Sequence, residues 1–251
     1  MKYANFSRAR VRFIKYVHLF PKITHYYCLY SKKIVPLHRF SIKYSTMQMD
    51  SNILTADTRL VIFDLDGTLY KKNGMVRKML CAAPLDCIKM LAERKTRNQL
   101  RGVWLQDETT FYKTYFQTMA TYCSQSAEQL QHWYFSRYMP LMVRVIGRYY
   151  KPVEWFANFV SECRRREVKL VILSDYGHTH EKLNALGIDE QQFDWVISAP
   201  ELGGLKPAAQ LITKVAERFS VSPNQCIVIG DREDTDGQLA RAGGAMFCLV
   251  Q

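Results

Sequence analysis

An apolar run that ends in two carboxylates is the feature that most constrains how this chain can fold. Residues 61–69 read Val-Ile-Phe-Asp-Leu-Asp-Gly-Thr-Leu, which sets Asp64 and Asp66 two positions apart. Residues two apart on an extended strand share a face, and Gly67 lets the backbone turn directly afterwards. The apolar run disfavours a merely solvated acidic turn. We therefore predict a buried strand that ends in a site where one carboxylate attacks and its neighbour handles protons.

Three further polar segments occur later in the chain, two of them directly after apolar runs. Ser174-Asp175 follows the run 168–173, and Gly230 to Asp236 follows the run 226–229. Between them stands Lys206-Pro207. Taken in this order with the first segment, they resemble the four motifs of the haloacid dehalogenase-like (HAD) hydrolase superfamily. The resemblance covers roughly residues 57 to 251 and points to the C1-capped, phosphoglycolate phosphatase-like branch.

The resemblance implies a role for each motif residue. Asp64 is expected to be the nucleophile, Asp66 the general acid and base, and Lys206 a fixed positive charge beside them. Thr68, Ser174 and Lys206 are expected to bind the phosphate. The expected metal ligands for Mg²⁺, the implied cofactor, are Asp64, the backbone carbonyl of Asp66, and Asp231. Asp236 is favoured over Glu233 and Asp234 as the supporting acid behind them.

The expected fold class is α/β, a Rossmann-like parallel sheet with an inserted α-helical cap. Five apolar runs are predicted to be buried strands: 59–64, 168–173, 195–198, 226–229 and 246–250. Helices are predicted over His180–Leu186 ending at Gly187, over Pro207–Phe219 with proline in the first turn, and over Gly237–Ala242 closed by Gly243. Polar residues that follow parallel strands gather at the carboxyl edge of the sheet, where such sheets bind ligands.

About a hundred residues separate the first two motifs, far more than one crossover helix needs. Helices are expected there at Arg77–Arg94, Glu108–Tyr122 and Gln129–Tyr138, with a capping box from Ser126 to Gln129. The aromatic residues of this region are expected to form its core. The predicted organisation is a HAD core at 57–76 and 162–251, a helical C1 cap at 77–161, and a basic extension at 1–56.

Charge is concentrated in that extension. Residues 1–50 hold ten Lys or Arg and a single acid, Asp50, so most of the net charge of +12 lies outside the expected domain. A nucleic-acid partner is therefore not expected, and the N-terminal apolar runs are too short for stable membrane insertion. The extension is interpreted as disordered or as the product of an upstream start, with Met47 or Met49 as alternatives. A mitochondrial transit peptide and a basic membrane-surface segment are the other readings.

Together these features predict a Mg²⁺-dependent phosphoric monoester hydrolase that acts on a small phosphorylated metabolite through an aspartyl-phosphate. The acid at position 66 disfavours carbon–halogen chemistry, because the haloacid dehalogenases of this superfamily lack it. A phosphomutase or a non-catalytic HAD-fold binding protein are the alternatives. Seven scattered cysteines without a CxxC pair favour a reducing compartment, expected to be the cytoplasm. The ester and the oligomeric state are not readable from the residues.

Overall fold

The computed structural model describes residues 27–30, 33–36 and 53–250. Most of the basic extension, including both alternative start methionines, lies outside these ranges. Within it, β1 (Tyr27–Tyr30) and β2 (Lys33–Pro36) pair as a two-stranded antiparallel sheet. Among the described residues, no helix has both the length and the apolar character needed to cross a bilayer.

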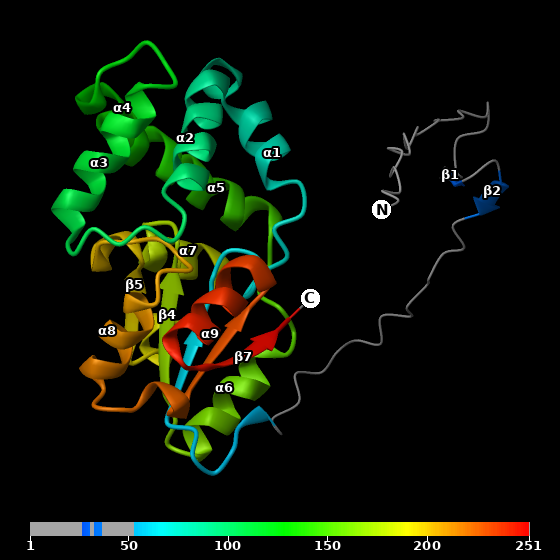
Figure 1. The fold of residues 1–251 in the computed structure, drawn as a ribbon, viewed down its shortest axis with the longest axis vertical. Helices are drawn as coiled ribbons and strands as arrows, with labels where there is room; N and C mark the ends of the chain where they lie inside the picture. Colours follow the sequence, from blue (N-terminus) through cyan, green and yellow to red (C-terminus); the bar gives the residue numbers. More distant parts are fainter. Residues whose placement is uncertain (1–26, 31–32, 37–52, 251) are drawn as a thin grey trace, which may run out of the picture. The chain divides into compact units, whose positions relative to one another are not determined.

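A five-stranded parallel sheet forms the centre of the folded body, in the order β5-β4-β3-β6-β7 (Figure 1). The strands are β3 (Leu60–Phe63), β4 (Lys169–Ser174), β5 (Trp195–Ser198), β6 (Cys226–Gly230) and β7 (Met246–Leu249). All five predicted strands are present, but β7 is not buried as predicted, because it lies at the edge of the sheet with Met246 and Leu249 exposed. Phe63 lies level with Ile172 of β4 and Ile229 of β6, so the residues that follow these three neighbouring strands meet at one edge.

Helices cover both faces of the sheet. One face packs against α6 (Phe156–Arg165) and α7 (Thr179–Leu186), and the other against α8 (Gln210–Arg218) and α9 (Gln238–Gly243). Successive residues of β3 alternate between the two: Val61 and Phe63 belong to the first core, Leu60 and Ile62 to the second. This burial on both sides explains why the strand reads as a continuous apolar run.

Several of the predicted helix boundaries in this part were wrong. The helix predicted to begin at Pro207 begins at Gln210, because residues 205–208 form a turn in which the Ala208 amide donates to the Leu205 carbonyl. Gly243 is the last residue of α9, and Gly244, with a φ of 77°, ends it. A single π-type turn, Glu233–Gly237, precedes α9. One-turn 3₁₀ helices occupy Pro84–Asp86, Glu190–Gln192, Pro200–Leu202 and Pro223–Gln225.

Between β3 and α6 the chain forms five α-helices, here called the helical insert. They are α1 (Met75–Ala82), α2 (Cys87–Gln99), α3 (Glu108–Ala120), α4 (Ala127–Trp133) and α5 (Met139–Tyr149). Figure 1 shows the insert beyond the carboxyl ends of the strands, so it faces the edge of the sheet where the motif residues gather.

The predicted helix over 77–94 is two helices, because Pro84 cannot continue α1 and a 3₁₀ turn begins there. The helix predicted over 129–138 is regular only as far as Trp133, where α4 ends. A π-type turn over Tyr134–Tyr138 follows it and leads directly into α5, which ends at Tyr149. The capping box between Ser126 and Gln129 is confirmed.

Aromatic side chains form the core of the insert, as expected. Their rings stack or meet edge to face at centroid distances of 5 to 6.5 Å, as between Tyr112 and Phe116 at 5.8 Å. The members are Phe111, Tyr112, Tyr115, Phe116, Trp133, Tyr134 and Tyr138. Offset and edge-to-face pairs of this kind add stability beyond the apolar area they bury. The insert is therefore a packed unit with its own aromatic core.

Candidate active site

Asp64 lies immediately after β3 and is held by two donors. Lys206 Nζ donates to Asp64 Oδ1 at 2.6 Å, and the Thr68 hydroxyl donates to Asp64 Oδ2 at 2.9 Å. The carboxylate is 7% exposed, yet it lines the wall of a cavity. Its orientation is thus fixed while it remains accessible from the pocket, which is what an in-line nucleophile requires.

Lys206 bridges two carboxylates at the floor of the site. Besides Asp64, its ammonium donates to Asp236 Oδ1 at 2.8 Å. Burial alone lowers the pKa of this lysine, but the charges of Asp236 and Asp64 outweigh burial and raise its pKa above the ordinary value. Lys206 is therefore a permanent positive charge next to the nucleophile, and Asp236 is the carboxylate that positions it.

Asp66 is enclosed by three donors, two of which sequence reasoning missed. The Tyr70 hydroxyl donates to its Oδ1 at 2.6 Å, and the Ser174 hydroxyl and Lys182 Nζ each donate to its Oδ2 at 2.8 Å. Burial favours the neutral acid, but the charge and hydrogen bond of Lys182 outweigh it and lower the Asp66 pKa. In the free protein Asp66 is accordingly an oriented carboxylate.

A signal for Lys182 was present in the sequence. Buried positions on α7 recur at helical spacing, with Thr179, Leu183 and Leu186 on the face that meets the core. Lys182 belongs to that stripe and is fully buried. A lysine within an apolar helical stripe needs a buried anionic partner, and the helix directly follows the motif that carries Ser174.

The acidic loop after β6 divides its residues between the pocket and the surface. Asp231 lines the pocket, whereas Glu233 pairs with Arg241 at 2.6 Å. Asp234 instead bonds Arg232 and Arg101. Gly230 makes room for the supporting acid, because a Cβ at that position would collide with the Asp236 side chain.

The geometry of the acids fits a divalent cation. One carboxylate oxygen from each of Asp64, Asp231 and Asp236 lies within 4.8 Å of the others. Lys72 marks the same place: its ammonium contacts Asp231 Oδ2 at 3.0 Å and the backbone carbonyl of Asp66 at 2.5 Å. Hard oxygen donors arranged around one point, already attracting a positive charge, are the ligand set that Mg²⁺ prefers.

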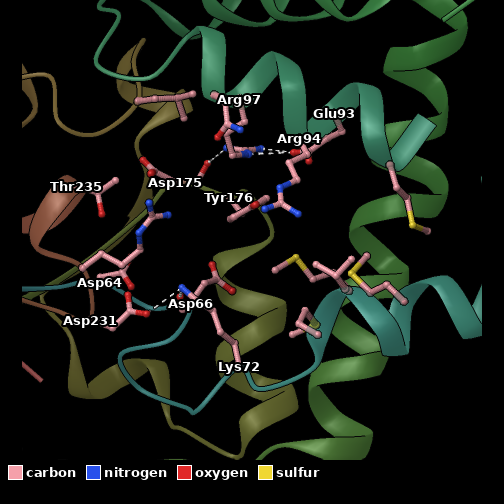
Figure 2. A pocket seen from close by; sticks show the side chains of 18 of the residues that line it. Asp64, Asp66, Lys72, Glu93, Arg94, Arg97, Asp175, Tyr176, Asp231 and Thr235 are labelled. Atoms are coloured by element: carbon pink, nitrogen blue, oxygen red, sulfur yellow. Dashed lines mark hydrogen bonds and ion pairs between the residues drawn. The ribbon is translucent and has the colours of Figure 1, made fainter. Parts of the chain in front are cut away.

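Above these carboxylates, the insert contributes an ion pair that sequence reasoning did not identify. Figure 2 shows Arg97 and Glu93 on α2 facing Asp175 and Tyr176 of the second motif. Arg97 donates to Glu93 at 2.9 Å and to the Asp175 carbonyl at 2.6 Å, and its guanidinium lies 3.8 Å from the centre of the Tyr176 ring. The Tyr115 hydroxyl also donates to Glu93, at 2.9 Å. These contacts fasten the insert to the core directly over the site.

The structure thus brings together every residue singled out from the sequence. Six side chains line or reach one pocket, namely Asp64, Asp66, Lys206, Asp231, Asp236 and, through Asp64, Thr68. Ser174 differs from its expected orientation, because its hydroxyl donates to Asp66 and accepts from the Tyr176 amide. Its role as a phosphate ligand stays a prediction.

A parallel sheet with this carboxylate and lysine cluster at its carboxyl edge, facing a helical insert, defines an enzyme of the α/β class with a Rossmann-like core. More specifically, the chain belongs to the haloacid dehalogenase-like hydrolase family, which matches residues 58–244.

Solved structures share the fold. The HAD-hydrolase YfnB from Bacillus subtilis, described as bound to magnesium, is 14% identical with a TM-score of 0.54, covering 77% of this chain and 88% of that one. A 2-haloacid dehalogenase from Pseudomonas syringae is 13% identical with a TM-score of 0.53, covering 76% and 86%. The L-2-haloacid dehalogenase from Xanthobacter autotrophicus is 19% identical with a TM-score of 0.51, covering 77% of each chain.

One curated relative matches a shorter stretch. The chloroplastic protein SUPPRESSOR OF QUENCHING 1 from Arabidopsis thaliana is 28% identical over 95 residues. That stretch is 37% of this chain and 9% of the plant protein, so the chain spans only a small part of the length of this relative.

Proposed function

We propose that this protein is a Mg²⁺-dependent phosphatase that hydrolyses a phosphate monoester through an aspartyl-phosphate on Asp64. The observation that carries the proposal is the pair of differently held carboxylates. Asp64 faces the cavity beside a permanently charged lysine, and Asp66, two residues on, is oriented by Tyr70, Ser174 and Lys182. Two carboxylates in distinct environments are suited to two distinct roles.

In the first half-reaction an Asp64 oxygen attacks phosphorus and the bond to the leaving oxygen breaks. Lys206 stabilises the negative charge shared by Asp64 and the phosphoryl oxygens, because it stays protonated between two carboxylates. The leaving alkoxide takes its proton from Asp66. Asp66 is ionised in the free protein, so this proton must arrive with the substrate, whose second phosphate proton titrates near pH 6.

In the second half-reaction Asp66 accepts a proton from the attacking water, and the bond between phosphorus and the Asp64 oxygen breaks. Lys182 and Tyr70 hold the Asp66 carboxylate in place for this transfer. The products are inorganic phosphate and free Asp64. Lys182 thereby acts through Asp66 as a positioning residue.

The residues that would hold Mg²⁺ are Asp64, Asp231 and the carbonyl of Asp66, with Asp236 held close by against Lys206. When bound there, the ion would neutralise charge on the transferring phosphoryl group. We further propose that the helical insert acts as the cap that selects the substrate, a small phosphorylated metabolite. The proposed compartment is the cytoplasm, with mitochondria as the alternative, and imaging of the full chain tagged at its C-terminus tests it.

Hydrolysis of p-nitrophenyl phosphate by the full chain, with and without Mg²⁺, tests the proposal. Chloride release from 2-chloropropionate should be measured in parallel, because several solved structures with this fold are dehalogenases. We expect Mg²⁺-dependent release of nitrophenol and no chloride. Asp64→Asn is the matched control, since it keeps the shape of the side chain and removes the nucleophile.

The other outcomes separate the alternatives. Chloride release without phosphatase activity would contradict the proposal in favour of carbon–halogen chemistry. Phosphorylation of Asp64 without release of phosphate to water would indicate a phosphomutase. A folded protein that neither turns over nor becomes phosphorylated with any ester of a panel of phosphorylated metabolites would favour the binding protein.

A further inference from the structure

The cavity of the active site extends well beyond the carboxylates. Its volume is about 580 Å³, and it continues from the phosphoryl site into the space between α1, α2 and α5. Figure 2 shows sulfur-bearing side chains on this helical side, away from the labelled aspartates. The methionines that line the cavity are Met75, Met79, Met90 and Met142. The part of the pocket formed by these four residues is here called the methionine chamber.

The chamber continues to the surface as apolar lining. Val76 and Leu91 line the same cavity and are 56% and 58% exposed. Apolar side chains gathered around a groove are typical of ligand-binding sites. Apolar residues therefore line this part of the cavity from the buried methionines to the solvent-exposed surface of α1 and α2.

Charged and polar side chains also line the cavity, and the buried ones of the insert already have partners. The Tyr138 hydroxyl donates to Glu93 at 3.3 Å, and Glu93 and Arg97 are bonded to each other. The remaining polar lining residues of α1 and α2, such as Arg77, Arg94 and Asn98, are exposed. A sugar seated among the four methionines would leave the hydroxyl groups that face them without hydrogen bonds, which is costly.

From these observations we propose that the substrate is a phosphate monoester of an apolar alcohol or phenol, whose hydrocarbon part lies in the methionine chamber. This inference rests on the proposed phosphatase function. Methionine side chains are flexible and polarisable, so they can close around hydrocarbon groups of different shape. The cavity size is within the range of pockets that enclose a whole organic ligand, well beyond a bare phosphoryl group.

A homologous series of n-alkyl phosphates from ethyl to octyl tests the proposal with the full chain and Mg²⁺. Each methylene transferred from water to an apolar pocket should raise kcat/KM by at most about fourfold. We expect kcat/KM to rise by about twofold to fourfold per carbon until the chamber is filled. Hexyl phosphate should therefore exceed glucose 6-phosphate, which has the same number of carbons, by at least tenfold.

Variants assign the effect to the chamber. Met79→Gln and Met142→Gln, made separately, should flatten the dependence of kcat/KM on chain length, and the far-UV circular dichroism spectrum of each variant reports correct folding. Met246→Gln is the matched control, because Met246 lies on β7 outside the cavity and is 38% exposed. It should leave the whole series unchanged.

Three results would overturn the inference and leave the phosphatase function standing. They are a rate independent of chain length, a preference for glucose 6-phosphate over hexyl phosphate, or a preference for phosphoglycolate over ethyl phosphate. The last result would assign Arg77 of α1 and Arg94 of α2, both exposed, to a second anionic group. Absence of turnover with every ester, including p-nitrophenyl phosphate, would instead contradict the proposed function itself.

Discussion

Replacing Lys72 with methionine should strengthen the binding of Mg²⁺. The Lys72 ammonium contacts Asp231 and the carbonyl of Asp66, two of the groups proposed to hold the ion (Figure 2). A lysine and a divalent cation cannot occupy this position together. Magnesium must therefore displace the lysine, and part of its binding free energy is spent on breaking these contacts.

The size of the effect follows from the exposure of the pair. The Lys72 side chain is 40% exposed and that of Asp231 19%, so solvent screens their attraction considerably. An exposed ion pair contributes about 0.2 to 1 kcal/mol, and the hydrogen bond to the carbonyl adds about 1 kcal/mol. A total of about 1 to 2 kcal/mol corresponds to a roughly 5- to 30-fold lower Kd for Mg²⁺ in Lys72→Met.

Isothermal titration calorimetry with MgCl₂ measures this Kd without substrate or turnover. Lys71→Met is the matched control, because Lys71 is the exposed neighbour and its removal changes the net charge equally. Asp231→Asn should weaken binding and so confirm where the ion sits. An unchanged or higher Kd in Lys72→Met would refute the reasoning, as would an equal gain in Lys71→Met.

Three further predictions concern stability and the turn after β3. Lys182→Met should lower the free energy of unfolding by about 3 to 5 kcal/mol, because it leaves Asp66 buried without its ionic partner. Urea denaturation measures this free energy, and a loss under about 1 kcal/mol would contradict the prediction. The native Asp66 pKa is lowered, so its stabilising contribution is present above about pH 4 and is lost as the pH falls through the native value. The free energy of unfolding of Asp66→Asn should therefore fall less steeply below pH 4 than that of the wild type, as measured by urea denaturation at a series of pH values. Parallel pH dependences in the two proteins would contradict this. Gly67→Ala should abolish Mg²⁺ binding in calorimetry, because Gly67 has a φ of +113° and an added Cβ would collide with the Asp231 side chain. A Kd equal to that of the wild type would contradict the close approach of Gly67 to Asp231.

The sheet was predictable from the sequence because four of its strands, β3, β4, β5 and β6, are largely buried. Each strand reads as a continuous apolar run, and polar residues follow three of them, so Asp64, Ser174 and Asp231 could be placed at one edge. The resemblance to HAD hydrolases supplied the expected roles. Helix boundaries were predicted less reliably: Pro207 is a helix-start signal, yet α8 begins three residues later.

What the sequence did not reveal are the partners of the predicted residues. Glu93 and Arg97 stand four apart on α2 and resemble an ordinary surface pair, but the second motif buries them in the folded chain. The competition between Lys72 and Mg²⁺ for the proposed metal site was not visible in the sequence for a related reason. Lys72 follows the first motif at a position typical of a solvated loop, and only the turn at Gly67 returns its ammonium to Asp231.

Trapping of the phosphorylated enzyme tests the central claim most directly. The full chain with Mg²⁺ and a turned-over phosphate ester would be quenched in acid within milliseconds, digested and analysed by mass spectrometry, with Asp64→Asn beside it. A single phosphoryl group on the peptide that contains Asp64, absent from Asp64→Asn, is the predicted result. Turnover without a phosphorylated peptide, or with phosphate on another residue, would contradict the assignment of Asp64 as the nucleophile.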